Sequence, residues 1–194
     1  MGRPPTDARQ RLADAAAALL REQGLHASGV KQIAAAARVP MGSLYFHFPG
    51  GKQELVRSAM TAAGSAVDQA LDRVCSFSGS AREAVAAHLE QSGAALAASG
   101  YRSGCPLATT ALELGPDDAD VAEVIAAWFS SWRARIEAAL HADGYVEAGS
   151  LATLVLAALE GGLLLARVER DLAPLASVAA TLDALLAGAP RTGG

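Results

Sequence analysis

Three aromatic side chains and a histidine crowd one short segment near the N-terminus, at Tyr45, Phe46, His47 and Phe48. A phenol hydroxyl and an imidazole can donate hydrogen bonds to phosphate, and an aromatic ring can touch the methyl group of thymine. On a helix, Phe48 shares a face with Leu44, so we expect it in the core, with the other three turned partly or wholly outward. The alternative, in which every ring packs a small core, applies best to Phe48 and least to Tyr45.

Two short helical patterns position these side chains. We expect one helix over residues 29–37, capped by Ser28, and a second over residues 41–47, which begins after Pro40 and ends before a Pro-Gly-Gly stretch. Two helices joined by a three-residue turn predict a helix-turn-helix, in which the second helix lies in the major groove of DNA. The small side chains of Ala34–Ala37 let the two helices approach closely. The expected buried contacts are Ile33, Val39 and Leu44.

Composition and periodicity place the whole chain in the all-α class. The 194 residues are 52% hydrophobic, which is enough for a real core, and much of this content is alanine, a strong helix former. We expect an N-terminal three-helix helix-turn-helix domain over residues 1–51 and a C-terminal helical ligand-binding and dimerisation domain over residues 52–194. The first helix starts near residue 7 and ends at Gly24. Further helices are expected over 52–75, 81–99, 106–114, 117–142, 147–171 and 174–187.

Charge divides unevenly along the chain. Residues 1–57 carry eight basic and four acidic side chains, a net charge of +4, whereas the remainder carries eight basic and sixteen acidic ones, a net charge of -8. A basic N-terminal part on an acidic body indicates an N-terminal contact with a polyanion. Chance segregation of solvated charges is the alternative.

The stretch GVKQIAAAARVPMGSLYFHFPGGKQEL, residues 29–55, resembles the DNA-binding signature of the tetracycline-repressor (TetR) family. The resemblance covers about residues 7–57. The loop FPGGK, and the more local stretch SGCPLATTALELG at residues 103–115, resemble the LmrA/YxaF-like subgroup. The resemblance implies a homodimeric, ligand-responsive transcriptional repressor that binds a pseudo-palindromic operator in double-stranded DNA.

The resemblance also implies which side chains contact DNA. Those that would hold the DNA backbone are Ser28, Lys31, Tyr45, His47 and Lys52, and those that would face base edges are Ser43 and Phe46. Lys52 also stands at the positive start of the next helix, where phosphate binds favourably. Two positions depart from the family pattern: many members carry glycine where Arg38 stands and a basic residue where Met41 stands. Because Met41 cannot hydrogen-bond a base edge, DNA shape and apolar contacts must carry more of the recognition.

The acidic body contains both tryptophans of the chain, four residues apart on one expected helix face. They are either ordinary core or the walls of an apolar ligand cavity, in which a few polar groups orient the ligand. We expect a flat, largely uncharged aromatic effector, and the resemblance adds an antibiotic or flavonoid-like compound. The candidate ligand-binding residues are His88, Cys105, Thr109, Glu113, Trp128, Phe129, Trp132 and Glu160, with Thr110 as a further polar candidate.

The stretch LATLVLAALEGGLLLARVERDL, residues 151–172, is apolar on nearly every side. A helix of this kind must be buried over most of its surface, which is hard to achieve within one small chain. Burial against a second copy therefore predicts a homodimer through the last two helices. The longest apolar run, Leu151–Leu159, is about half of the ~20 residues that a membrane span needs, so we expect a cytoplasmic protein without a membrane contact.

Other classes of function have less support. Cys75 and Cys105 lie thirty residues apart without the spacing of a metal site, so neither a disulfide framework, nor a metal, nor another cofactor is expected. A thiol redox sensor at Cys105 is one alternative, because a helix start lowers the pKa of a thiol. A small helical enzyme that uses Cys105, His88 and Glu113 is another, but nothing in the spacing brings them together and we expect no catalysis. A purely architectural DNA-binding protein would not need the tryptophan-bearing body.

Overall fold

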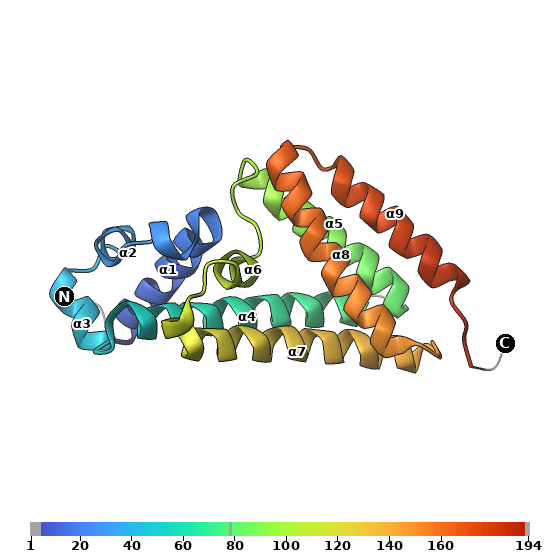
Figure 1. The fold of residues 1–194 in the computed structure, drawn as a ribbon, viewed down its shortest axis with the longest axis horizontal. Helices are drawn as coiled ribbons and strands as arrows, with labels where there is room; N and C mark the ends of the chain where they lie inside the picture. Colours follow the sequence, from blue (N-terminus) through green and yellow to red (C-terminus); the bar gives the residue numbers. More distant parts are fainter. Residues whose placement is uncertain (1–4, 78, 193–194) are drawn as a thin grey trace. The chain divides into compact units, whose positions relative to one another are not determined.

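The computed structural model describes residues 5–77 and 79–192. Within these residues the chain forms α-helices and one short 3-10 helix, and no strand, which confirms the all-α class (Figure 1). The expected helices are all present, with bounds that differ by a few residues. The elements are α1 Pro5–Ala27, α2 Val30–Ala37, α3 Met41–His47, α4 Gly51–Phe77, α5 Ala81–Ala98, α6 Pro106–Ala111, η1 Pro116–Asp118, α7 Ala119–Ala142, α8 Ala148–Glu169 and α9 Ala173–Gly188.

Packing divides the chain into two compact units. The N-terminal unit comprises Met1–Ala66 and Cys105–Ala127, so it holds α1, α2, α3, α6, η1 and the first parts of α4 and α7. The C-terminal unit comprises Val67–Gly104 and Trp128–Gly194, so it holds α5, α8, α9 and the remainders of α4 and α7. The division falls inside two long helices, α4 and α7, and in the loop before α6.

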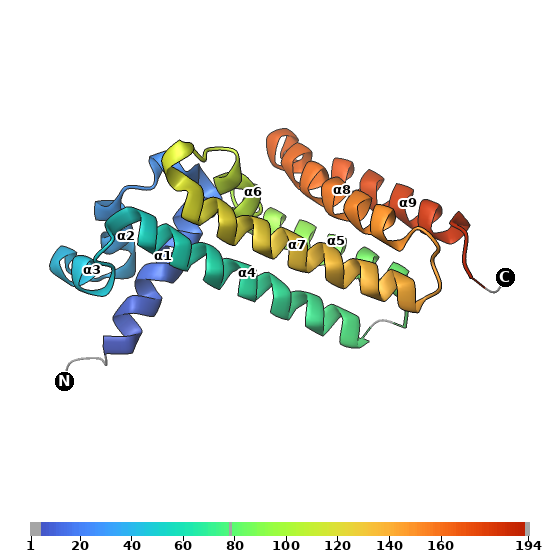
Figure 2. The ribbon, with the colours of Figure 1, turned by 60° about the horizontal axis from the view of Figure 1, so that its bottom comes forward.

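In the N-terminal unit, α2 and α3 pack against α1 and against each other (Figure 2). The expected contacts between the two short helices are confirmed, because Ile33, Val39 and Leu44 are all buried. Phe48 is also fully buried, as its position four residues after Leu44 predicts. From α1, the residues buried in this core include Leu12, Ala16 and Leu20.

Helix α1 breaks at Gly24, whose φ of 82° and ψ of -177° are accessible only to glycine. The break leaves the Gly24 carbonyl free of the regular helix ladder, and the Ser28 hydroxyl donates a hydrogen bond to it at 2.6 Å. The prediction that Ser28 caps α2 is therefore wrong. Gly29 takes the N-cap position instead, without a side-chain hydrogen bond.

The turn between α2 and α3 passes through the left-handed region at Arg38, where φ is 54° and ψ is 48°. This conformation lets the Arg38 N–H bond back to the Ala35 carbonyl at 3.0 Å, which ends α2. A non-glycine residue adopts this conformation at a cost of about 1–2 kcal/mol. The turn geometry therefore explains why glycine suits this position.

In the C-terminal unit, α5, α8 and α9 pack around a shared apolar cluster. Leu175 of α9 inserts between two glycines, because a Cβ at Gly93 of α5 would lie 3.0 Å from its Cδ2 and a Cβ at Gly162 of α8 would lie 2.8 Å from its Cδ1. The second glycine of the Gly161-Gly162 pair is thus needed for close helix packing, whereas Gly161 faces open space.

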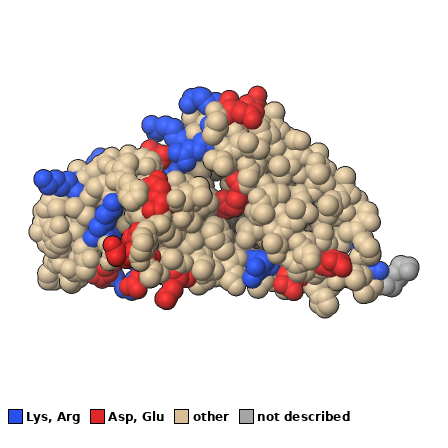
Figure 3. All heavy atoms as spheres, in the orientation of Figure 1, with Lys and Arg blue, Asp and Glu red and all other residues tan. Residues whose placement is uncertain are grey.

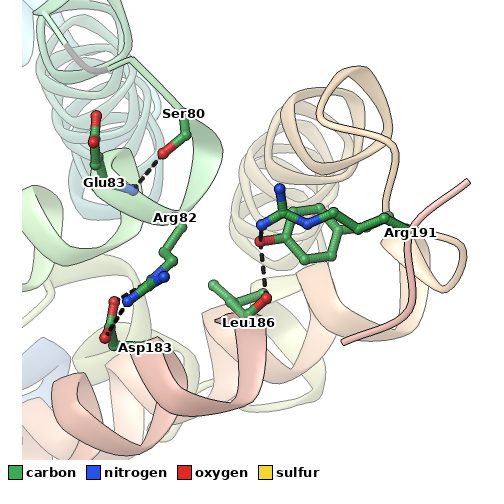
Figure 4. A network of polar contacts seen from close by, with 7 residues as sticks. Ser80, Arg82, Glu83, Asp183, Leu186 and Arg191 are labelled. Carbon is green, nitrogen blue, oxygen red and sulfur yellow. Dashed lines mark hydrogen bonds and ion pairs between the residues drawn. The ribbon is translucent and has the colours of Figure 1, made fainter. Parts of the chain in front are cut away.

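Polar contacts join the ends of these helices (Figure 4). The Arg82 guanidinium of α5 donates to both carboxylate oxygens of Asp183 in α9, at 2.5 and 2.7 Å. The hydrogen bonds from Arg82 lower the pKa of Asp183. Beyond α9, Arg191 lies over the ring of Tyr145, 4.4 Å from its centroid, and the Tyr145 hydroxyl donates to the Leu186 carbonyl at 3.0 Å. These contacts tie α5 to α9, and the chain before α8 to the end of α9.

Helix α8 is long and apolar enough to cross a membrane by length and composition alone. A third of its apolar window is buried within the chain, by packing against α5 and α9. The remainder is half-buried or exposed, and its exposed large side chains are Leu154, Leu164, Leu165 and Val168. Only part of the apolar surface of α8 is thus buried within one chain.

Candidate nucleic-acid interface

Helix α3 presents two aromatic side chains to solvent. Tyr45 is 53% exposed and Phe46 is 76% exposed, so both rings are available for contact with another molecule. The half-buried ring of His47 meets the Phe46 ring edge-on, with centroids 5.1 Å apart. Because Leu44 anchors the opposite side of α3 in the core, the exposed rings are held on a fixed helix face.

The other predicted DNA contacts around α3 are also accessible. Lys31 is exposed on the first turn of α2, and Met41 and Ser43 are half-buried on the first turn of α3. The exposed Arg38 adds a positive charge in the turn between the helices. The surface of α2, α3 and their turn thus combines cations, a phenol hydroxyl and an exposed apolar ring, which are the groups that contact phosphates and thymine methyl groups.

Two of the residues predicted to contact the DNA backbone have structural roles inside the N-terminal unit. Ser28 is fully buried, and its hydroxyl is already bonded to Gly24. The half-buried Lys52 donates from Nζ to the Leu25 carbonyl at 2.6 Å, which joins the start of α4 to the broken end of α1. An ammonium group has three protons, so Lys52 can hold this contact and still face an anion with another proton.

Two arginines of α1 position the helix-turn-helix, and sequence reasoning missed this role. Arg9 donates from Nη1 to the His47 carbonyl at 2.8 Å, and its guanidinium lies 4.6 Å from the centroid of the Phe48 ring. Arg11 donates from Nη1 to the Ala37 carbonyl at 3.0 Å. Each arginine therefore satisfies a carbonyl at the end of a short helix, which has no partner within that helix. The sequence shows only their positive charge, which contributes to the basic N-terminal part expected to contact a polyanion.

The candidate ligand-binding residues fall in both units. Cys105, Thr109 and Glu113 lie in the N-terminal unit. There the Thr109 hydroxyl donates to the Cys105 carbonyl at 2.8 Å, and Glu113 accepts from the His26 N–H at 2.8 Å. Cys105 is half-buried and directly precedes α6, a helix of only six residues. The side chain of Cys75 lies outside the described residues.

The remaining candidates lie in the C-terminal unit: His88, Trp128, Phe129, Trp132 and Glu160. Trp132 is 2% exposed, and its ring packs against Phe129 and Trp128, with centroids 5.6 and 6.2 Å apart. Nδ1 of His88 and Nε1 of Trp132 are buried and lack a hydrogen-bond partner within the described residues. Burial lowers the pKa of His88. Glu160 is half-buried on α8.

Comparison with known families agrees with this geometry. Residues 12–59 match the model of the bacterial regulatory proteins of the tetR family, and residues 81–181 match the C-terminal domain of LmrA/YxaF-like transcriptional regulators. The second match alone spans more than half of the chain. The chain therefore belongs to the TetR family of transcriptional regulators, within the LmrA/YxaF-like group.

Individual relatives cover nearly the whole chain. An uncharacterized HTH-type transcriptional regulator of Mycobacterium tuberculosis is 34% identical over 185 residues, which cover 92% of this chain and 93% of that protein. The uncharacterized HTH-type transcriptional regulator YxaF of Bacillus subtilis is 30% identical over 182 residues, which cover 93% of this chain and 95% of that protein. A TetR regulator from Chloroflexus aurantiacus has a TM-score of 0.83 at 25% identity, covering 97% and 98% of the two chains. Family members are transcriptional regulators rather than enzymes.

Proposed function

We propose that this regulator is a cytoplasmic, homodimeric repressor that binds a pseudo-palindromic operator and releases it when a small aromatic molecule binds the C-terminal unit. The observation that carries the DNA-binding part is the pair of exposed rings on α3, Tyr45 and Phe46, held on a fixed face by the buried Leu44. Tyr45 donates to phosphate, Phe46 contacts base edges, and Lys31, Met41, Ser43, His47 and Lys52 complete the interface.

The exposed face of α8 supports the dimer. Leu154, Gly161, Leu165 and Val168 follow one another at spacings of seven, four and three residues, so they lie along one side of the helix, with Leu164 beside them. Figure 3 shows that the surface over α8 and α9 is largely uncharged, with charged side chains mostly toward its edges. A continuous apolar face with a glycine in it suits close packing against the same two helices of a second copy.

Release of the operator needs a ligand that binds the form unable to bind DNA better than the DNA-binding form. The two recognition helices of a dimer must meet major grooves about 34 Å apart, or a multiple of this distance. Helices α4 and α7 each contribute to both units, so a ligand in the C-terminal unit can act on the N-terminal unit through them. A coupling of about 1–3 kcal/mol, or 5–150-fold in operator affinity, is enough for regulation.

Footprinting the purified protein on the DNA that flanks its own gene tests this proposal. We expect protection of two related half-sites one or two helical turns apart. On the operator so defined, Phe46→Ala should change the preference among base sequences, whereas Lys52→Ala should weaken binding to all sequences and lower the salt slope by about one. Protection without half-sites, or a Phe46→Ala protein with unchanged preference, would contradict the proposed interface.

A further inference from the structure

Helix α3 carries no side chain of the kind that reads a base through paired hydrogen bonds. Its seven residues, Met41–His47, include no arginine, lysine, asparagine or glutamine, which bind guanine or adenine in this way, and no carboxylate to accept from cytosine. Its polar side chains, at Ser43, Tyr45 and His47, supply only hydroxyl groups and an imidazole. Base recognition by α3 therefore depends largely on apolar contact.

A glycine stands on the first turn of α3, where the fold does not require one. Gly42 is exposed, and its φ lies outside the left-handed region. A Cβ added there would meet nothing within 4 Å. Because alanine is a much better helix former than glycine, alanine would suit the free protein better. The bare backbone of Gly42 thus leaves an open space on the surface of α3 that no described part of the chain fills.

The ring of Phe46 borders the same space. Phe46 follows Gly42 by four residues, so the two lie on one face of the helix. A helical side chain leans toward the start of its helix, which directs the Phe46 ring over the turn that holds Gly42. The ring is 76% exposed, and the His47 ring supports it edge-on, with centroids 5.1 Å apart. An aromatic ring and a stretch of bare backbone therefore face the solvent side by side.

The chemistry of this space selects among the four bases. In the major groove, only thymine presents an apolar group, its 5-methyl group, whereas the other bases present amino groups or carbonyl oxygens at the corresponding edge. A polar group placed against a phenyl ring would lose hydration without gaining a partner. A methyl group loses no hydrogen bond there and buries apolar surface.

We propose that Gly42 and Phe46 form a contact site for the 5-methyl group of one thymine in each operator half-site. The methyl group fills the space at Gly42 and packs against the Phe46 ring. In a helix-turn-helix, the first residues of the recognition helix contact base edges in the major groove, which is where Gly42 lies. The inference rests on the proposed function, because it names the base that the DNA-binding surface recognises.

Uracil provides the test, because it differs from thymine only by the methyl group. An operator is selected from random duplexes with the intact protein, and each thymine of its half-sites is replaced by uracil in turn. We expect one position per half-site at which uracil weakens binding about fourfold, and about fifteenfold when both half-sites are changed, the size expected for one buried methyl group each. Cytosine at this position should bind weakly, and 5-methylcytosine should recover part of the loss.

Variants of the two residues assign the methyl group to this site. Phe46→Ala should bind the thymine and uracil operators equally, whereas Phe46→Leu, which keeps an apolar side chain, should retain a preference for thymine. Gly42→Ala should weaken binding to the thymine operator more than to the uracil operator, because its Cβ competes with the methyl group for the same space. Lys31→Ala is the matched control, since the loss of a phosphate contact should weaken both operators equally.

The ratio of the two affinities separates this site from its rivals. A merely structural role of Phe46 would lower both affinities in Phe46→Ala and leave their ratio unchanged. That result, an unchanged ratio in Gly42→Ala, or an operator in which uracil replaces every thymine without loss would overturn the methyl site and leave operator binding intact. A preference for guanine that disappears in Arg38→Ala, with thymine indifferent, would also overturn it, because recognition would then lie in the turn. If no sequence is selected at all, the proposed function fails, and this inference fails with it.

Discussion

The carboxylate of Glu113 lies against Gly24, at the point where α1 breaks. Its Oε2 accepts a hydrogen bond from the His26 N–H at 2.8 Å, so it caps the turn that follows the break. A Cβ added at Gly24 would lie 1.8 Å from Oε1 of Glu113. On the other side of this turn, Lys52 bonds the Leu25 carbonyl. The residues after α6 and the start of α4 are thus joined through one short segment of α1.

Gly24→Ala should destabilise the protein strongly. The substitution strains a φ of 82° and displaces the Glu113 carboxylate, so we expect the free energy of unfolding to fall by about 2–4 kcal/mol. Gly42→Ala is the control, because a Cβ there meets nothing within 4 Å and alanine favours the helix. Urea unfolding measures both. The double variant with Glu113→Ala should lose less than the two single changes together, and strict additivity would show that the two residues are not coupled.

Arg11→Met should weaken DNA binding because it loosens the position of α2, and not because it removes a charge that contacts DNA. The variant keeps the apolar stem but loses the donor to the Ala37 carbonyl, so the end of α2 is less firmly held. We expect weaker operator binding with a nearly unchanged salt slope. Lys31→Ala, at an exposed cation of α2, should instead lower the slope by about one. Titrations at several salt concentrations distinguish the two, and an equal fall in slope would make Arg11 a phosphate contact.

Arg38→Gly should stabilise the protein by about 1 kcal/mol, because glycine adopts the left-handed conformation without a steric cost. Arg38→Ala is the matched control, since it removes the same charged side chain but keeps the strain. Thermal unfolding of the three proteins provides the measurement. If both variants changed the melting temperature equally, the effect would come from the arginine side chain and not from the turn.

Val168→Glu should separate the dimer and abolish operator binding together. Val168 is 73% exposed in one chain and lies on the apolar face of α8, where a charge would be buried on association. Light scattering should give twice the 19.7 kDa chain mass for the unaltered protein and the single mass for the variant. Leu112→Glu is the control, because Leu112 is 82% exposed but lies in the N-terminal unit. Tight operator binding by a monomeric variant would contradict the dimer proposal.

His88 should make the stability depend on pH in mildly acidic solution. Burial lowers the pKa of His88 in the folded state, so below the unfolded value of about 6.5 the unfolded chain binds more protons. The stability from this group is complete above that pH and falls as the pH drops toward the folded pKa. The melting temperature of His88→Leu should therefore decrease less than that of the unaltered protein between about pH 7.5 and 5.5. His141→Leu, at an exposed position of α7, is the control and should keep the full decrease.

The sequence by itself determined the all-α class, the helix-turn-helix and most helix bounds. Helix α3, expected over residues 41–47, is found at Met41–His47. Leu44 and Phe48 were correctly placed in the core, and Tyr45 and Phe46 outside it. These features are local: helical periodicity, a proline before the helix and glycines after it act over a few residues, so the sequence alone reveals them.

Tertiary structure decided which polar groups serve the fold and which face outward. The expected boundary after residue 51 followed the loop before α4, whereas packing places α6 with α1 in the N-terminal unit. Ser28 and Lys52 carry the residue types of DNA contacts, yet both bond to carbonyls around the break in α1. Arg9 and Arg11 likewise bond the ends of α3 and α2. Each of these partners is a backbone carbonyl made available by a helix end, and which side chain reaches it depends on how distant segments pack rather than on neighbouring residues.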